Sequence, residues 1–326
     1  MPNRSMRLLL IALVLELLVS LAASKVGWAA WPERAVRVVV PSPPGGAVDL
    51  AARLYAERLA SDWKVPVVVD NRPGADGILA AQAMVNARDD HTLLFSFPGL
   101  VTVVPLLHES LPYDPATDLV PISAAASDTL AVVAGPLLAA TNLDGLLGLA
   151  QVRPIALNWT AVPGAPYLTF LDFQKKAGVE MTFVPYRSPA SALPDLIAGQ
   201  IQVLVASLAP VLPLLRDKRL TPLAVTTQQR SPSLPEVPPA AEQGHPELTI
   251  EARLGFFGSK ALDANLRDRI AADVRRMAED RAMRDRLRAA GLEACSSTPL
   301  GYATHLRDQA THWATLSRTY GVRGPQ

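Results

Sequence analysis

The residues best suited to chemistry form a glycine turn that follows an apolar run. Val38–Val40 predicts a buried strand, because β-branched side chains fit the pleated surface of a covered sheet. Gly45 and Gly46 allow backbone conformations that other residues avoid, and a helical pattern begins at Ala47. This order aims the unpaired N–H groups of the first helical turn beyond the strand's carboxyl end. We therefore predict that the turn cradles a carboxylate or phosphate.

Two features of this turn leave alternatives open. Neither G-x-G-x-x-G nor G-x-x-x-x-G-K-[ST] occurs in the sequence, so nucleotide binding lacks support, and an ordinary strand–helix turn would contain the same glycines. Asp49 lies in the first helical turn, where the helix dipole stabilises a carboxylate. It could equally accept a hydrogen bond from a hydroxyl, an ammonium group or a bridging water.

Small or polar residues follow two further predicted strands. They are Ser96, Phe97 and Pro98 after the strand Thr92–Phe95, and Ser207 after the strand Ile201–Val205. Ligands of open α/β sheets bind at the carboxyl ends of the strands, so these residues are expected beside the glycine turn. Phe97 fits a place in the core equally well.

Recognisable catalytic constellations are absent from the sequence. The five histidines are scattered without the H-x-x-x-H or H-E-x-x-H spacing of a metal site. No G-x-S-x-G surrounds a serine at a strand end, and Cys295 resembles a small buried hydrophobe more than a nucleophile. We expect no enzyme, no catalytic residue, no metal and no cofactor.

Composition places the chain among globular proteins. Hydrophobic residues make up 49% and charged residues 19% of the 326 positions, and the formal charge of +1 argues against a nucleic-acid partner. A single cysteine excludes an intramolecular disulfide, so stability must come from packed cores.

The first 29 residues are predicted to be a secretory signal rather than part of the fold. Arg4 and Arg7 precede the apolar run Leu8–Leu15, and small residues follow. Glu16 interrupts the run, which is shorter than the roughly 18 residues that argue for a membrane span. We therefore expect export to the periplasm.

Alternating strand and helix patterns predict an α/β protein with two lobes. The chain is expected to cross to the second lobe near Ser123 and to return after a strand at Leu223–Thr226. Lobe 1 would hold residues 30–123 and 227–326, and lobe 2 residues 124–226. Further expected elements are a strand at Ile155–Leu157, a loop at Asn158–Tyr167, a helix from about Leu168 to Lys176, and solvated C-terminal helices at Asn265–Ala289 and Gly301–Thr319.

Several blocks of sequence together resemble one family. In chain order they read WPERAVRVVVPSPPGGAVDLAARLYAERL, VVVDNRPGADG, LPYDPATDLVPIS, FVPYRSPASALPDLIAGQIQ, LAVTTQQRSPSLPEVPPAAEQG and AGLEA. Their order and spacing, from Trp31 to about Val322, resemble the Bug-type, TctC-like periplasmic solute receptors of tripartite tricarboxylate transporters. Several such blocks are more specific than any single motif.

The resemblance implies a type II-like periplasmic binding protein fold, in which two lobes, each a mostly parallel sheet flanked by helices, close around a ligand cleft. It implies a receptor, expected to be a monomer, that binds a small carboxylate (a di- or tricarboxylate, an aromatic acid or an amino acid) largely through backbone groups and water. Its partners would be the membrane subunits of a tripartite tricarboxylate transporter. A sensory receptor signalling to a sensor kinase is the alternative, and an exported hydrolase with Gly45–Gly46 as oxyanion site is a remote one.

Carried over to this sequence, the resemblance places the binding loops at Ser42–Asp49 and Asn158–Tyr167, completed by the segment after Phe95 and by Ser207. The expected ligand-binding residues are Ser42, Pro43, Gly45, Gly46, Ala47, Asp49, Ser96, Phe97, Pro98, Thr160, Ala161, Gly164, Ala165, Ser207 and Arg253.

The second loop departs from the family pattern Y-G-S-x-G-x-G-S, since it reads NWTAVPGAPYLT here. Ala165 stands where a hydroxyl donor is usual, and Arg253 stands where a Trp is common. An Arg that faces the cleft could form a bidentate pair with a carboxylate, so we predict a preference for a larger or more aromatic acid. Alternatively, Arg253 points to solvent and Trp159 packs in the core of lobe 2.

Overall fold

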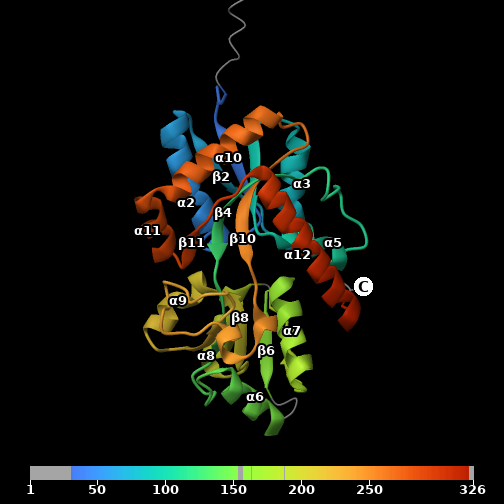
Figure 1. Cartoon of the computed structure of the whole chain (residues 1–326), viewed down its shortest axis with the longest axis vertical. Helices are drawn as coiled ribbons and strands as arrows, with labels where there is room; N and C mark the ends of the chain where they lie inside the picture. Colours follow the sequence, from blue (N-terminus) through green and yellow to red (C-terminus); the bar gives the residue numbers. More distant parts are fainter. Residues whose placement is uncertain (1–30, 153–156, 163, 187, 323–326) are drawn as a thin grey trace, which may run out of the picture.

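The computed structural model describes residues 31–152, 157–162, 164–186 and 188–322. These residues form two α/β lobes stacked end to end, each built on one sheet with a core on both faces (Figure 1). The predicted two-lobed α/β fold is therefore confirmed. The predicted secretory signal lies outside the described residues. No helix within the described ranges is long and apolar enough to cross a membrane.

Lobe 1 is built on a six-stranded sheet with the order β11–β4–β10–β3–β1–β2. Its strands are β1 (Val36–Val40), β2 (Val67–Asn71), β3 (Thr92–Ser96), β4 (Val120–Asp128), β10 (Ala252–Gly258) and β11 (Leu292–Ala294). Its helices are α2 (Ala47–Trp63), η1 (Ala75–Gly77), α3 (Ile78–Ala87), α4 (Gly99–Thr102), α5 (Val104–Leu107), α10 (Ala264–Glu279), α11 (Arg281–Ala289) and α12 (Pro299–Tyr320). Apolar residues of α2, α10 and α11 cover one face of the sheet, and those of α3 and α12 cover the other.

Lobe 2 is built on a five-stranded sheet with the order β7–β6–β8–β5–β9. Its strands are β5 (Leu130–Ala134), β6 (Asn158–Ala161), β7 (Thr182–Phe183), β8 (Val203–Ser207) and β9 (Thr221–Val225). Its helices are α6 (Leu143–Val152), α7 (Ala165–Ala177), α8 (Pro189–Ala198), α9 (Leu208–Arg216), η2 (Ala240–Gln243) and η3 (Pro246–Leu248). Helices α6 and α7 cover one face, and α8 and α9 cover the other.

Both sheets contain antiparallel pairs, but most strands run in one direction, as expected: β1 to β4 in lobe 1 and β6 to β9 in lobe 2. β1 is parallel to β2 and β3, and β6 is parallel to β7 and β8. β4, β5 and β10 instead run antiparallel to every neighbour that they pair with. These three strands adjoin the two crossings between the lobes. A strand that leads into a crossing must run toward the other lobe, and a strand that follows a crossing must run away from it. The crossings therefore determine the directions of these strands.

The first crossing lies at Thr129 rather than near Ser123. Strand β4 continues to Asp128, with Ala124 to Asp128 paired to β10 and Ala126 to Asp128 also paired to β11. Only one residue then separates β4 from β5. The small side chains of this stretch carry a weak strand pattern, and they fit because Tyr55 of α2 packs against them and donates to Ala125 O at 2.6 Å.

The return crossing lies at Glu251 rather than after Thr226. The segment between β9 and β10 stays on lobe 2, where Leu234 and Val237 join one core and Leu248 joins the other. The proline-rich sequence of this segment shows no helix or strand period, so no local pattern predicts that its apolar residues cover lobe 2.

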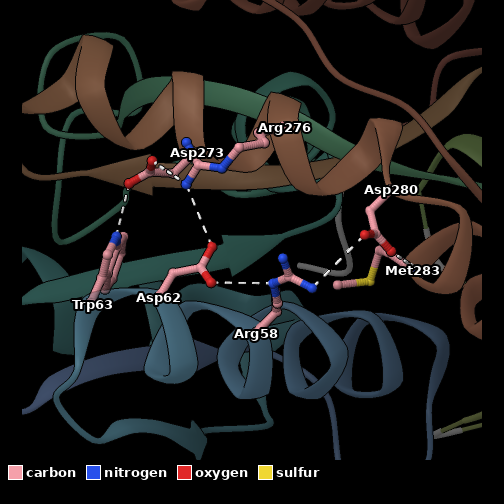
Figure 2. Close-up of polar contacts among 7 residues, drawn as sticks. All are labelled: Arg58, Asp62, Trp63, Asp273, Arg276, Asp280 and Met283. Atoms are coloured by element: carbon pink, nitrogen blue, oxygen red, sulfur yellow. Dashed lines mark hydrogen bonds and ion pairs between the residues drawn. The ribbon is translucent and has the colours of Figure 1, made fainter.

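A polar seam joins α2 to α10 on the outside of lobe 1 (Figure 2). Trp63 Nε1 donates to Asp273 Oδ2 at 2.8 Å, and Arg276 contacts both Asp273 at 2.8 Å and Asp62 at 3.4 Å. The indole of Trp63 is otherwise buried in the core beneath. The seam fixes the returning chain against the helix that follows the glycine turn.

The same seam continues to α11. Arg58 lies between Asp62 at 3.3 Å and Asp280 at 3.8 Å (Figure 2). Asp280 has extended backbone angles, and its carboxylate accepts from Met283 N at 3.0 Å as the N-cap of α11. This cap divides the predicted helix Asn265–Ala289 into two helices, since an extended residue ends the first and begins the second.

Helix α12 starts on lobe 1 and ends against α7 of lobe 2 (Figure 1). Trp313 of α12 packs with Val103 of lobe 1 and Leu168 of lobe 2 in one buried cluster. Tyr320 Oη donates to Asp172 Oδ1, a buried carboxylate on α7. The C-terminal helix therefore ties the two lobes together on one side.

Candidate ligand-binding site

The strand registers bring four strand ends to the boundary between the lobes. β8 ends at Ser207 opposite Leu130, the residue at which β5 enters lobe 2. β3 ends at Ser96 opposite Gly255, near the start of β10 where the chain re-enters lobe 1. Since β6 is parallel to β8 and β1 is parallel to β3, all four carboxyl ends point to the same boundary. The four segments predicted from the sequence follow these ends.

The first loop leads into a helix with an uncapped N-terminus. Gly45 has a φ of +87°, a conformation that favours glycine, and Gly46 is the N-cap of α2 without any side-chain cap. The N–H groups of the first turn, starting with Ala47, therefore have no acceptor within the helix. Ser42 adds a buried Oγ with no hydrogen-bond partner in the described structure, whereas Pro43 is exposed.

Asp49 braces this loop from inside the helix. It is 1% exposed, and its oxygens accept from Gly45 N at 2.9 Å, Asn71 Nδ2 at 2.8 Å and Arg53 Nε at 3.0 Å. Burial alone would raise the pKa of Asp49, but hydrogen bonds from Arg53, Gly45 and Asn71 outweigh it and hold the pKa below its usual range. These contacts favour a positioning role over a direct ligand contact for Asp49.

The second loop is shorter than predicted. Strand β6 occupies Asn158–Ala161, where the loop was expected, and the first part of the predicted strand, Ile155 and Ala156, lies outside the described residues. Helix α7 begins at Ala165, ahead of the predicted start near Leu168. Pairing of β6 with β8 extends the strand, a long-range effect that a local pattern does not contain.

Each predicted residue of the second loop lies at a strand or helix end. Thr160 and Ala161 close β6, Gly164 is the uncapped N-cap of α7, and Ala165 is its first residue. Gly164 has a φ of +102°, and a side chain there would approach Val103 of lobe 1. Thr160 Oγ1 is buried without a hydrogen-bond partner among the described atoms.

The remaining predicted segments divide between core and boundary. Ser96 is buried and its Oγ donates to Phe97 O at 3.3 Å, while the Phe97 ring packs against both cores of lobe 1. Pro98 is the N-cap of the short helix α4. Ser207 is the N-cap of α9, and its Oγ donates to Asp128 Oδ2 at 2.5 Å. Of these residues, Ser207 has the clearest place at the boundary.

A small cavity lies beside the second loop. Its volume of about 10 Å³ suits a single water molecule, and Thr160 is one of the residues that line it. Tyr186 and Ser188 line the other side, and sequence reasoning missed both. The hydrogen bond to Asp195, together with burial, raises the pKa of Tyr186 to about 12, so its hydroxyl stays protonated. No motif marks these two residues.

Trp159 packs in the core of lobe 2, the alternative that the sequence left open, and Arg253 is partly exposed to solvent. Arg253 Nη2 contacts Glu251 Oε2 at 3.0 Å, and its carbonyl accepts from Tyr302 Oη of α12, so its contacts lie with α12 and the return crossing rather than with the four loops. Trp159 is 1% exposed in the core of lobe 2 and stacks on Tyr167 at 5.5 Å. The predicted pairing of Arg253 with a ligand therefore has no support in its described contacts.

Asp128 is a boundary residue that the sequence analysis did not identify. Burial raises the pKa of its carboxyl to about 7, and the hydrogen bond from Ser207 opposes that rise. The surrounding sequence AAASDTL carries no motif, so only the pairing of β4 and the start of α9 reveals its position.

Chemical groups for catalysis or metal binding do not converge in the described structure. No group of three or more His, Cys, Asp or Glu side chains there is placed to hold a metal ion. Burial raises the pKa of the Cys295 thiol to about 12, although nearby Arg253 lowers it, so this cysteine is not an activated nucleophile. The arrangement is suited to binding rather than to reaction.

The fold matches solved structures over almost its full length. R. palustris Rpa4515 with adipate has a TM-score of 0.85 and 29% identity, and the match covers 90% of this chain and 100% of that chain. MatC (Rpa3494) from Rhodopseudomonas palustris with bound malate has a TM-score of 0.78 and 25% identity, with 88% and 99% covered. The fold and the strand ends at the lobe boundary define a periplasmic solute-binding protein.

The family follows from the sequence matches. The family model described as the tripartite tricarboxylate transporter family receptor, TctC, matches residues 51–322. Protein BugT from Bordetella pertussis is 30% identical over 297 residues, which cover 90% of this chain and 91% of BugT. This chain belongs to the tripartite tricarboxylate transporter receptor family, so the predicted Bug-type, TctC-like resemblance is confirmed. It is a receptor and not an enzyme.

Proposed function

We propose that this receptor captures a small carboxylate between its lobes and delivers it to the membrane subunits of a tripartite tricarboxylate transporter. One observation carries the proposal. Helix α2 begins after Gly46, α7 after Gly164 and α9 after Ser207, all at the lobe boundary, and no side-chain cap is found at these three N-termini in the described structure. Unpaired N–H groups and helix dipoles favour an anion at such positions. At α9 the dipole and the Ala209 N–H would contribute, because Leu208 N donates to Thr129 O at 2.7 Å and Pro210 has no N–H.

Two similar structures support a carboxylate as the ligand. Rpa4515 was solved with adipate and MatC with malate, both of which are carboxylates. The buried, unpartnered hydroxyls of Ser42 and Thr160 would supplement the backbone donors, either directly or through a water in the small cavity.

Ligand capture would draw the lobes together. A ligand shifts a two-state equilibrium only by its differential affinity, so a carboxylate held by N–H groups of both lobes favours the closed state. The hinge would lie at the two crossings, Thr129 and Glu251, because the chain passes between the sheets there. The closed pair of lobes would then dock on the membrane subunits that the family name implies.

The binding claim is tested with an Ala47→Pro variant. Proline is well tolerated at the first position of a helix but removes the N–H that we assign to the ligand. Calorimetric titration of refolded, ligand-free protein should show affinity for its carboxylate falling by roughly tenfold to a hundredfold, the loss expected for one hydrogen bond to a charged group.

Ala264→Pro is the matched control. Ala264 is the first residue of α10 and is exposed, at a helix start that does not follow any of the four strand ends. This variant should bind as the unmodified protein does. Equal affinities for all three proteins would contradict the proposed role of the α2 N-terminus.

A further inference from the structure

We infer that Asp128 is a subsite for the ammonium group of an amino acid, so that the ligand is a zwitterion rather than a simple di- or tricarboxylate. This inference rests on the proposed function, because the subsite has a use only if a carboxylate binds between the lobes. It adds a substrate class to that function.

Asp128 lies level with the start of α2. The bond from Tyr55 Oη to Ala125 O fixes the height of α2 against β4. From Ala125, the strand carries Asp128 about 10 Å closer to lobe 2 at its usual rise per residue. From Tyr55 back to Ala47, α2 covers about 12 Å in the same direction. The carboxyl group and the uncapped helix N-terminus therefore reach the boundary together.

The carboxyl group of Asp128 is only half satisfied. The residue is 6% exposed, and Ser207 Oγ donates to its Oδ2 at 2.5 Å. Its Oδ1 is buried and has no hydrogen-bond partner in the described structure. Among the described Lys, Arg and His residues, none forms an ion pair with it. The neighbouring Thr129 also has a buried, unpartnered Oγ1.

Asp49 shows how this chain satisfies a buried carboxylate when the protein itself supplies the partners. Its oxygens accept from a backbone N–H, from Asn71 and from the guanidinium of Arg53. Asp128 has one hydroxyl donor and no cation. When its carboxyl is ionised, a buried Asp128 needs a counter-charge as well as hydrogen bonds, and a cationic donor would supply both.

A zwitterionic ligand fits both sides of this arrangement. Ser207, the donor to Asp128, is also the N-cap of α9, whose dipole favours a carboxylate; its first turn offers the Ala209 N–H, because Leu208 N donates to Thr129 O at 2.7 Å and Pro210 has no N–H. An α-amino acid carries its ammonium and carboxylate on one carbon, so the two groups can reach adjacent partners. A second carboxylate beside Asp128 would meet a like charge, and a hydroxyl would supply a hydrogen bond without the counter-charge.

The test uses three sets of acids that differ only at the α-carbon. They are alanine, lactate and propionate; aspartate, malate and succinate; and phenylalanine, phenyllactate and phenylpropionate. Calorimetric titration of the refolded protein should show the amino acid binding more tightly than its partners in at least one set, by about tenfold or more for one charged hydrogen bond. Asp128→Asn keeps the shape and should bring the members of that set to within about threefold of each other.

Asp273→Asn is the matched control, because Asp273 is a hydrogen-bonded, mostly buried aspartate of the same lobe on α10. It should retain the preference for the amino acid. If the sets that bind all contain an acid that binds as tightly as its amino acid, or if Asp128→Asn keeps the preference unchanged, the inference is overturned and the proposed function stands. If none of the nine acids binds detectably, both this inference and the proposed function are overturned.

Discussion

The first and second loops, one from each lobe, begin helices in the same way but are supported differently. In lobe 1, Asp49 holds the Gly45 N–H and is itself held by Arg53 and Asn71. In lobe 2, the second loop follows Trp159, which is buried among aromatic rings. The hydrogen bond to Asp49 holds a backbone N–H of the first loop in one orientation. Packing around Trp159 supports the second loop without bonding its N–H groups. If the proposed function holds, the first loop would be the constant anion-binding element, and selectivity would depend on groups of the other lobe and on Asp128.

Replacing Trp159 should remove the aromatic packing that supports the second loop and destabilise the protein. The ring packs against Tyr167, Phe170 and Phe183 at centroid distances of 5.5, 4.7 and 5.0 Å. Trp159→Ala should lower the free energy of unfolding by about 3–5 kcal/mol, as large-to-small core changes do. Urea denaturation followed by circular dichroism measures this loss. A loss below about 1 kcal/mol would mean that packing is not what supports this loop.

The buried carboxyl of Asp128 predicts an unusual pH dependence of stability. Its pKa is about 7 in the folded protein against 3.8 in an exposed carboxyl, so between these values the folded state binds more protons than the unfolded state. Stability contributed by this group therefore falls as pH rises from about 4 to 7, by up to about 4 kcal/mol. Denaturation of the unmodified protein and of Asp128→Asn at both pH values isolates the effect. An equal difference at both pH values would contradict it.

Asp49→Asn should loosen the first loop by a smaller amount. The amide cannot accept from all three donors, so we expect a loss of about 1–3 kcal/mol in the free energy of unfolding, together with weaker ligand binding. Since the folded pKa of Asp49 is lowered, its contribution is present at neutral pH and is lost as pH falls below about 4. Stability measured against pH should show the two proteins converging in acid. Convergence at high pH instead would reverse the assigned role.

Local sequence signals predicted the elements around the first loop well. The valine run, the glycine turn and the start of α2 at Ala47 depend on neighbouring residues, and the structure has them as predicted. Alternating strand and helix patterns predicted the second lobe, and the family resemblance added the binding loop at Asn158–Tyr167. These features were accessible because strand, turn and helix signals lie within one short stretch.

The features that were not predicted from the sequence depend on contacts between residues far apart in the chain. Pairing with β8 made a strand of Asn158–Ala161, and pairing with β10 and β11 moved the first crossing to Thr129. Asp128 has no local signal at all, since its importance comes from burial and from Ser207, which lies 79 positions away in the sequence. A short polar residue in a run of alanines looks like any other surface residue until the sheets are assembled.

The most direct test of the account is a crystal structure of the receptor with its tightest-binding carboxylate. We predict that a carboxylate oxygen lies within about 3.2 Å of a first-turn N–H of α2 and that the same ligand contacts the start of α7 or α9. A ligand bound to one lobe alone, away from all three helix N-termini, would contradict the account.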